Sequence, residues 1–503
     1  MAPAKTTLAV LTCCVLILLP NFVPALGGIK SFDWHSIPAL WDMPVPELPS
    51  ADDTAVDQAR GEWLNAQAPS NLQDPSHVLD PFYEALLRGQ DVRVIHYGDS
   101  PTTADLVTGD VRVLLQRQFG DAGTGFTLIA KPWAWYNHRG VEMNSANWKI
   151  DIAGVGPARD GWFGLGGATF RGSEGAIARW KLKDGHHRVA EVAYQAQAEG
   201  GEFSFEADGV EVGRADTVAE TGQSAYARFD LPEGSKEFAL KVTRGTVRLY
   251  GVEFRKSGPG VIYSSLGVNG ASVTMLSHAF NTAHWAAQLQ HYRPDLVVLA
   301  YGTNESGYPA FIDSTWGREL TTAVRRLRAA LPEASILLMS PMDRGDRNDS
   351  GEIGTIAALP RLIRIEAGIA RETGVAFFNT FQAMGGEGTM GRWYNGEPRL
   401  VGADLIHPMP AGARVVGELL YRALQDGFSE YKLRQLNRSA GKTGTEPASE
   451  RASSAASLEP ALEKPAVETP GAEKIAPEKQ EPEKPADKPA AEKSETENSV
   501  VPK

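Results

Sequence analysis

The sequence predicts a three-layer α/β protein with a doubly wound parallel sheet, interrupted by an inserted all-β sandwich of the jelly-roll type. Two observations support this fold class. In two separate stretches, short apolar runs alternate with helical patterns, which is typical of parallel strands joined by crossover helices. Between these stretches, short strands separated by turn residues recur roughly every 8–12 residues, which indicates a sandwich.

The α/β elements fall on both sides of the sandwich. Helical spacing over 75–88 precedes a buried strand at 92–97, and a further helix is expected over 103–119. After the sandwich, strands are expected at 261–266, 295–301, 335–340 and 375–378, and helices at 274–290, 315–331, 361–373 and 410–425. The sandwich strands are expected at 176–182, 188–196, 201–207, 225–231, 237–243 and 246–255.

These patterns predict six regions along the chain. They are an export signal (1–25), an N-terminal arm (26–74), the first α/β part (75–142), the inserted sandwich (143–258), the second α/β part (259–437) and a disordered tail (438–503). The tail is rich in Pro, Glu, Lys and Ala, and no aromatic residue follows Tyr431, so the tail cannot bury enough apolar surface to fold. It is either an extended spacer or a solubilising terminus.

The composition limits the classes of function. The 503 residues include 50 Lys and Arg against 62 Asp and Glu, a formal charge of −12. A negative chain without a basic block argues against a dedicated nucleic-acid-binding protein. Cys13 and Cys14 are the two cysteines; adjacent cysteines pair poorly, and two thiolates cannot complete a zinc site. We therefore expect no cofactor and no metal.

The N-terminus has the pattern of a secretory signal. Lys5 precedes an apolar run of about 14 residues over 6–19, which is shorter than the roughly 20 residues of a membrane span. Val23-Pro24-Ala25 then places small residues at a cleavage site. We expect export to the periplasm or the extracellular side. The alternative is an uncleaved segment that holds the protein at the inner membrane.

Three polar motifs occur after predicted strands or before the last helix. They are Gly98-Asp99-Ser100, Gly302-Thr303-Asn304-Glu305 and Asp404-Leu405-Ile406-His407. Reactive groups collect at the carboxyl ends of strands in open parallel sheets, so these motifs can meet in one crevice. Their order along the chain (nucleophile, oxyanion donor, acid, base) predicts a serine hydrolase. No Gly-x-Ser-x-Gly elbow surrounds Ser100, which argues against the standard α/β-hydrolase arrangement.

Each motif also has a structural interpretation. Ser100 can be a helix N-cap rather than a nucleophile. Asn304 can cap a polar turn rather than donate to an oxyanion. Asp404 and His407 can form a surface turn rather than an acid–base pair. A metal site at this pair would need a third ligand, and no candidate has convincing spacing.

The motifs resemble blocks I, III and V of the SGNH (GDSL-type) hydrolases, which have a flavodoxin-like fold. The segment 267–272 matches the place of block II, with Gly270 as its glycine. The resemblance covers about residues 92–126 and 261–428. It implies that Ser100 is the nucleophile, His407 the general base and then acid, and Asp404 the residue that orients His407.

The same resemblance implies an oxyanion hole made by the backbone N–H groups of Ser100 and Gly270 and the side chain of Asn304. Glu305 occupies a position where the wider family often has Asp. Exported members with a carbohydrate-binding-like sandwich between blocks I and II are similar to the peptidoglycan O-acetylesterases of the bacterial periplasm. This similarity implies an acetylated glycan as the substrate and an association with the cell envelope.

Two groups of residues are candidate substrate contacts. Aromatic rings can stack on sugars, and polar side chains after a strand end can bind them. The candidates are Trp133, Trp135, Tyr136, His138, Asp343 and Arg344. The alternatives are that the rings only hold the two domains together and that the Asp343–Arg344 loop is a solvated surface loop with a salt bridge.

We therefore expect an extracytoplasmic serine esterase that removes O-acetyl groups from a cell-wall glycan or another polysaccharide. An O-acyltransferase and a lipid or thioester hydrolase remain open, because they use the same triad. A non-catalytic wall-binding module is the third alternative, although all three triad residues are present. No feature of the sequence indicates the oligomeric state.

Overall fold

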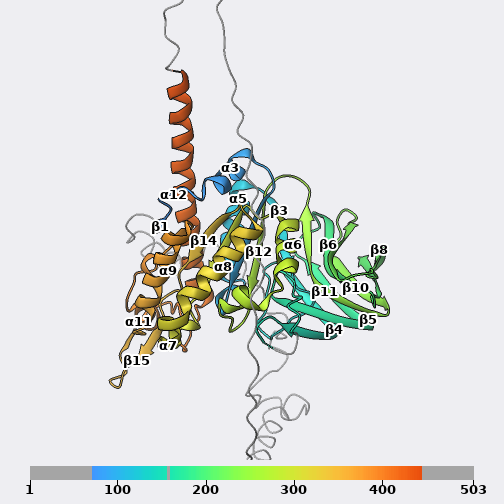
Figure 1. Cartoon of the computed structure of the whole chain (residues 1–503), viewed down its shortest axis with the longest axis horizontal. Coiled ribbons are helices and arrows are strands. Elements are labelled where there is room, and N and C mark those ends of the chain that lie inside the picture. The colour runs from blue at the N-terminus through green and yellow to red at the C-terminus, as the bar shows by residue number, and fades with distance from the viewer. Residues whose placement is uncertain (1–70, 156–158, 444–503) are drawn as a thin grey trace, which may run out of the picture. The chain divides into compact units, whose positions relative to one another are not determined.

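The computed structural model describes residues 71–155 and 159–443. The predicted signal, most of the predicted arm and most of the predicted tail lie outside the described residues. The described chain is mixed α/β, with a mostly parallel central sheet and an antiparallel β-rich part (Figure 1). Met1–Gly441 form one unit and Lys442–Lys503 another. The boundaries expected at 142/143 and 258/259 thus fall inside one unit.

Five parallel strands form the centre of the sheet, in the order β17-β14-β13-β2-β12. Counted along the chain from the β12 side, this order is 2-1-3-4-5, which is the doubly wound order of flavodoxin-like folds. The order reverses between β2 and β13, and ligands of such sheets bind at the carboxyl ends of these two strands. The strands are β2 (Val92–Gly98), β12 (Val261–Gly267), β13 (Leu296–Ala300), β14 (Ser335–Met339) and β17 (Ala376–Phe378).

Helices cover both faces of this sheet. Alternate residues of each strand belong to different cores: Val297 and Leu299 of β13 pack in one, and Leu296 and Val298 in the other. This alternation confirms the predicted three layers. The first core includes residues of α6 (Thr282–Tyr292), α8 (Gly317–Ala330) and α9 (Leu359–Thr373), and the second includes residues of α3 (Asp80–Arg88), α5 (Val107–Phe119) and α12 (Pro410–Thr443).

The β-rich part consists of two layers that share β11. One layer has the order β4-β5-β10-β7-β8, and β11 connects it to β6, β9 and β3. Because β3 also pairs in parallel with β12, the β-rich part and the α/β part share one continuous sheet. The strands are β3 (Asp121–Thr127), β4 (Val141–Ile152), β5 (Ala168–Leu182), β6 (His187–Ala196), β7 (Glu202–Ala207), β8 (Val210–Asp216), β9 (Gln223–Asp230), β10 (Glu237–Arg244) and β11 (Thr246–Lys256).

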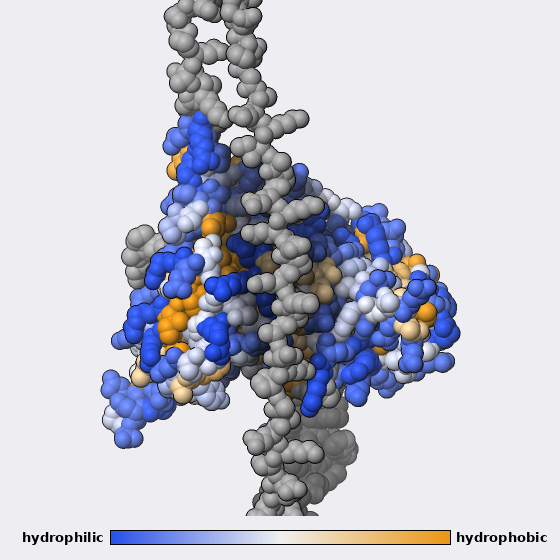
Figure 2. Space-filling view, viewed as in Figure 1, coloured by the Kyte–Doolittle hydropathy of each residue, from blue (hydrophilic) through white to orange (hydrophobic). Residues whose placement is uncertain are grey.

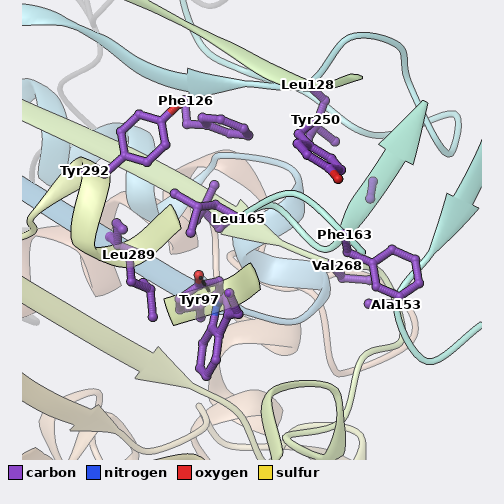
Figure 3. Close-up of a cluster of buried hydrophobic side chains, with 14 of the residues drawn as sticks. Tyr97, Phe126, Leu128, Ala153, Phe163, Leu165, Tyr250, Val268, Leu289 and Tyr292 are labelled. Atoms are coloured by element: carbon purple, nitrogen blue, oxygen red, sulfur yellow. Dashed lines mark hydrogen bonds between the residues drawn. The ribbon is translucent and has the colours of Figure 1, made fainter. Parts of the chain in front are cut away.

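Aromatic side chains fill the space between the two β layers. Trp180 of β5 stacks on Phe205 of β7 and meets the edge of Phe254 of β11, with ring centroids 6.3 and 5.9 Å apart. The same core continues toward the α/β part. Figure 3 shows Tyr97 of β2 and Leu289 of α6 in one cluster with Leu165 and Phe126. The shared core explains why the insertion does not separate as a unit of its own.

Two predicted helices are divided in the structure. The helix expected over 103–119 becomes α4 (Ser100–Thr103) and α5, because Asp105 between them has a φ of 52°, in the left-handed region. The helix expected over 274–290 becomes a π-helical segment, η4 (Met275–Ala279), and α6. Asn281 starts α6 by accepting a hydrogen bond from the His284 N–H.

Several elements were not predicted. One is β1 (Leu72–Gln73), which pairs antiparallel with β17. The others are β3, β4, β8, the β15–β16 hairpin (Gly345–Arg347 and Ile353–Thr355), η5 (Glu305–Gly307), α7 (Pro309–Phe311), η6 (Ile312–Trp316), α10 (Thr380–Ala383) and α11 (Thr389–Asn395). Within residues 71–155 and 159–443, no helix is long and apolar enough to cross a membrane. The face in Figure 2 is mainly hydrophilic, with small hydrophobic areas.

Candidate active site

Ser100 lies immediately after β2, at the point where the strand order reverses. Gly98 ends the strand, and the register places it beside Gly267 of β12 and Ala300 of β13. A Cβ atom on Gly98 would stand 2.2 Å from the Thr102 hydroxyl oxygen, so the tight turn into α4 needs glycine here. The turn leaves Ser100 partly exposed after a strand that is buried at every residue except Arg93.

The predicted triad is assembled. The Ser100 Oγ lies 2.8 Å from Nε2 of His407, and Nδ1 of His407 lies 2.6 Å from Oδ2 of Asp404. An ionised carboxylate only accepts hydrogen bonds, so the His407 proton belongs on Nδ1 and donates to Asp404. Nε2 is then free to accept the Ser100 proton, which is the arrangement of a nucleophile with its general base.

A closed turn holds the acid and the base together. The Gly402 N–H donates to the His407 carbonyl at 2.8 Å, and Leu405 between them adopts a φ of 60° while its side chain is buried. Partial burial would raise the pKa of Asp404, but hydrogen bonds from the His407 side chain and from the N–H groups of His407 and Ile406 outweigh it and lower that pKa. Asp404 is therefore kept ionised.

The predicted oxyanion donors come from three neighbouring segments. Ser100 follows β2, Gly270 follows β12, and Asn304 follows β13, and these strands lie side by side. Gly270 has a φ of 71°, which favours glycine. The Asn304 Nδ2 donates to the Ala271 carbonyl at 2.9 Å, which leaves its second hydrogen for a substrate oxygen. The three segments thus meet at the same edge of the sheet as the triad.

The aromatic candidates divide into exposed and buried residues. Trp135 is 58% exposed, and its indole N–H donates to Asn269, the residue before Gly270. Trp133 is partly buried, while Tyr136 and His138 are only 4% and 2% exposed, so these two cannot reach a substrate. The Tyr136 hydroxyl accepts a hydrogen bond from the Leu128 N–H, and Trp135 alone of the four presents a large exposed ring.

The loop after β14 also has a structural role. Asp343 is 2% exposed and accepts hydrogen bonds from the Thr355 hydroxyl and the Met390 N–H, so it does not contact a substrate. Arg344 is partly exposed and donates to the Thr303 carbonyl at 2.9 Å and to the Ser306 hydroxyl at 3.1 Å. Its guanidinium supports the turn that carries Asn304.

The sequence analysis did not predict the burial of acidic side chains in and after the motifs. Glu305 is 3% exposed and accepts hydrogen bonds from the N–H groups of Val273 and Gly302. Asp105 is 1% exposed and pairs with the buried Arg112. Their positions within or just after two of the motifs were visible in the sequence, but their burial was not. Within the described part of the chain, no three His, Cys, Asp or Glu side chains are grouped to hold a metal ion.

Comparisons with known proteins point to a family and a fold. The family model of the GDSL-like lipase/acylhydrolase family matches residues 241–415. No curated protein matches the chain. A solved peptidoglycan O-acetylesterase structure aligns with a TM-score of 0.60 at 24% identity, over 72% of this chain and 99% of that one. Over the matched residues the chain is similar to the GDSL-like (SGNH) hydrolases, and the aligned structure shows that it shares their fold.

The structure of a family two carbohydrate esterase from Clostridium thermocellum aligns with a TM-score of 0.24 at 13% identity, over 56% of this chain and 99% of that one. The region matched by the family model contains Gly270, Asn304, Asp404 and His407. Ser100 lies outside it because the β-rich insertion separates the first block from the others. The hydrogen bond between Ser100 and His407 restores that connection in space.

Proposed function

We propose that the protein is an exported serine esterase that removes O-acetyl groups from a cell-wall glycan. The observation that carries the proposal is the continuous hydrogen-bonded series from Ser100 through His407 to Asp404. The export itself is inferred from the sequence alone, from Lys5 and the apolar run that follows it.

The geometry supports a two-step reaction. His407 Nε2 takes the proton of Ser100 as Oγ forms a bond to the acetyl carbonyl carbon. The negative oxygen of the tetrahedral intermediate accepts hydrogen bonds from the N–H groups of Ser100 and Gly270 and from Asn304. The C–O bond to the sugar then breaks, and His407 gives its proton to the departing sugar oxygen. Water, deprotonated by His407, attacks the acetyl-serine and releases acetate.

The exposure of the triad side chains favours an ester whose alcohol component is bulky, such as a polysaccharide. The side chains of Asp404 and His407 are 48% and 46% exposed, so a polymer can approach them without entering a tunnel. Three exposed side chains with apolar surface are near the site residues, one through a hydrogen bond and two through their positions in the sequence. Trp135 bonds to Asn269, Tyr308 follows the turn of Asn304, and Met409 comes two residues after His407. Such surfaces suit sugar rings.

The first test is hydrolysis of a small aryl acetate. Ser100→Ala should lower kcat by a factor of roughly 10⁴ or more, with an unchanged circular dichroism spectrum. Ser429→Ala, an exposed serine of α12, is the matched control and should retain full activity. Unchanged turnover in Ser100→Ala would remove Ser100 from the role of nucleophile.

The second test concerns the substrate. Acetate release should be faster from O-acetylated peptidoglycan than from acetylated xylan, and hydrolysis of a long-chain ester should be slowest. A preference for the long-chain ester would contradict the glycan assignment and would favour a lipid esterase with the same triad.

A further inference from the structure

The oxyanion donors depend on segments that are distant in sequence. Ser100, Gly270 and Asn304 each belong to a different strand end, and the oxyanion hole requires all three donors at one point. Two buried carboxyl groups next to these residues, those of Asp99 and Glu305, lie where the segments meet.

Glu305 connects the second and third segments. Its Oε1 accepts a hydrogen bond from the Val273 N–H at 2.9 Å, and its Oε2 accepts one from the Gly302 N–H at 3.1 Å. The side chain of Ser272 also donates to this carboxylate. Both oxygens are thus used, and each holds the backbone two or three residues from an oxyanion donor.

Asp99 connects the first and third segments. It directly precedes Ser100, is 2% exposed, and faces the hydroxyl and N–H of Thr303. Burial and the nearby charge of Glu305 raise the pKa of Asp99 to about 8. Burial raises the pKa of Glu305 as well, and the hydrogen bonds from the N–H groups of Val273 and Gly302 counteract that rise.

We propose that Glu305 is a positioning residue of the oxyanion hole, which fixes Gly270 and Asn304 relative to each other by accepting from Val273 and Gly302. Glu305 does not touch the substrate. It acts because a carboxylate accepts on both oxygens and can therefore bind two N–H donors from two loops. The inference rests on the proposed function, since it assigns a role within the same esterase site.

Glu305→Gln tests this role with almost no change in volume. An amide has one accepting oxygen and one NH₂ group, so the variant must place a donor against the N–H of either Val273 or Gly302. We expect kcat for an aryl acetate to fall by about 10- to 100-fold, since a small misplacement of catalytic groups costs this much. KM should change by less than about threefold.

Glu319→Gln is the matched control. Glu319 is also buried, at 4% exposure, and accepts a hydrogen bond from Ser277, but it lies on α8 and connects no oxyanion segment. Its kcat should stay within about twofold of the parent protein. Binding of an arylboronic acid, which forms a tetrahedral adduct on the nucleophile, should weaken in Glu305→Gln in proportion to kcat and stay constant in Glu319→Gln.

The outcomes separate this inference from the proposed function. If the parent protein hydrolyses the aryl acetate through Ser100 and Glu305→Gln loses no more activity than Glu319→Gln, the positioning role is wrong and the esterase assignment stands. If the parent protein is inactive, the proposed function itself fails. If Glu305→Gln does not fold, Glu305→Asp replaces it. Its side chain is one methylene shorter and cannot reach both N–H groups, so it should show the same loss of kcat, and full kcat there would overturn the proposal.

Discussion

The Oγ of Ser100 lies 2.8 Å from Nε2 of His407, although 307 positions separate the two residues in the chain. The sheet explains the distance. β2 is central and ends at Gly98, while the turn that carries His407 immediately precedes α12, which packs against the sheet. The strands β3–β11 lie between the two residues in the chain, but they do not separate the nucleophile from its base in space.

Replacing the acid of the triad should disable the base. Asp404→Asn keeps the shape of the side chain but removes the charge that holds the His407 proton on Nδ1. We expect kcat for an aryl acetate to fall by roughly 10²- to 10⁴-fold, with little change in KM. Because both side chains are about half exposed, the thermal midpoint should hardly change. A loss below threefold would show that His407 does not depend on Asp404.

The parallel core and the triad could be predicted from the sequence because their signals are local. The run at β13 is uniformly apolar and those at β2 and β14 are mostly apolar, and each motif follows a strand end or precedes a helix. Strands β3 and β4 were missed, since β3 contains two glycines and β4 alternates exposed and partly buried polar residues. Such strands form because their neighbours pair with them, and those neighbours are distant in sequence.

The substrate contacts could not be predicted in the same way. The sequence does not distinguish an aromatic residue that stacks on a sugar from one that packs under a loop. The structure exposes Trp135 and buries Tyr136, which is the next residue in the chain. Asp343 and Glu305 were equally ambiguous. Each of them accepts a hydrogen bond from an N–H group more than 30 positions away, that of Val273 for Glu305 and that of Met390 for Asp343, and the sequence does not show this contact.

Removing the exposed ring should affect large substrates most. Trp135→Ala should lower kcat/KM for an O-acetylated glycan about tenfold more than for an aryl acetate, because a lost aromatic platform costs about 1 to 1.5 kcal/mol. Trp135→Phe keeps a ring but loses the hydrogen bond to Asn269, so its kcat/KM for the glycan should lie between those of the parent protein and Trp135→Ala. Leu87→Ala, an exposed apolar residue of α3, is the control. Equal losses on both substrates would contradict a role in glycan binding.

Asp99 should make the protein less stable as the pH rises. Burial and the charge of Glu305 raise the pKa of Asp99 to about 8 in the folded state, whereas an unfolded Asp ionises near pH ~4. Between these values the unfolded chain releases the proton and the folded chain keeps it, so each step upward in pH favours unfolding.

Asp99→Asn removes this titration. Urea unfolding at pH 5 and pH 8 should show a smaller loss of stability in the variant than in the parent protein, by an amount on the order of 2 kcal/mol. Asp230→Asn, at an exposed position of β9, should retain the pH dependence of the parent protein. Identical pH dependence in Asp99→Asn and the parent would mean that Asp99 ionises normally in the folded state.

The buried pair of Asp105 and Arg112 should be a major contributor to stability. Asp105 accepts hydrogen bonds from the Arg112 guanidinium, from the Thr108 hydroxyl at 2.8 Å and from the Arg139 N–H at 2.7 Å. Burial would raise the pKa of Asp105, but the positive charge of Arg112 outweighs it and holds that pKa well below its usual range. The contribution of this carboxylate to stability is therefore complete above the pKa of an unfolded Asp, near ~4, and is lost as the pH falls from there toward the folded-state pKa.

Asp105→Asn isolates the charge of this pair. Asparagine tolerates the left-handed backbone at this position, where φ is 52°, so the substitution adds little strain. It leaves the Arg112 side chain, which is 4% exposed, without its counter-charge. We expect the free energy of unfolding in urea at pH 7 to fall by about 3 to 5 kcal/mol. Asp230→Asn breaks the exposed pair with Arg228 and should cost little. A loss in Asp105→Asn as small as in Asp230→Asn would show that Arg112 finds another partner or water.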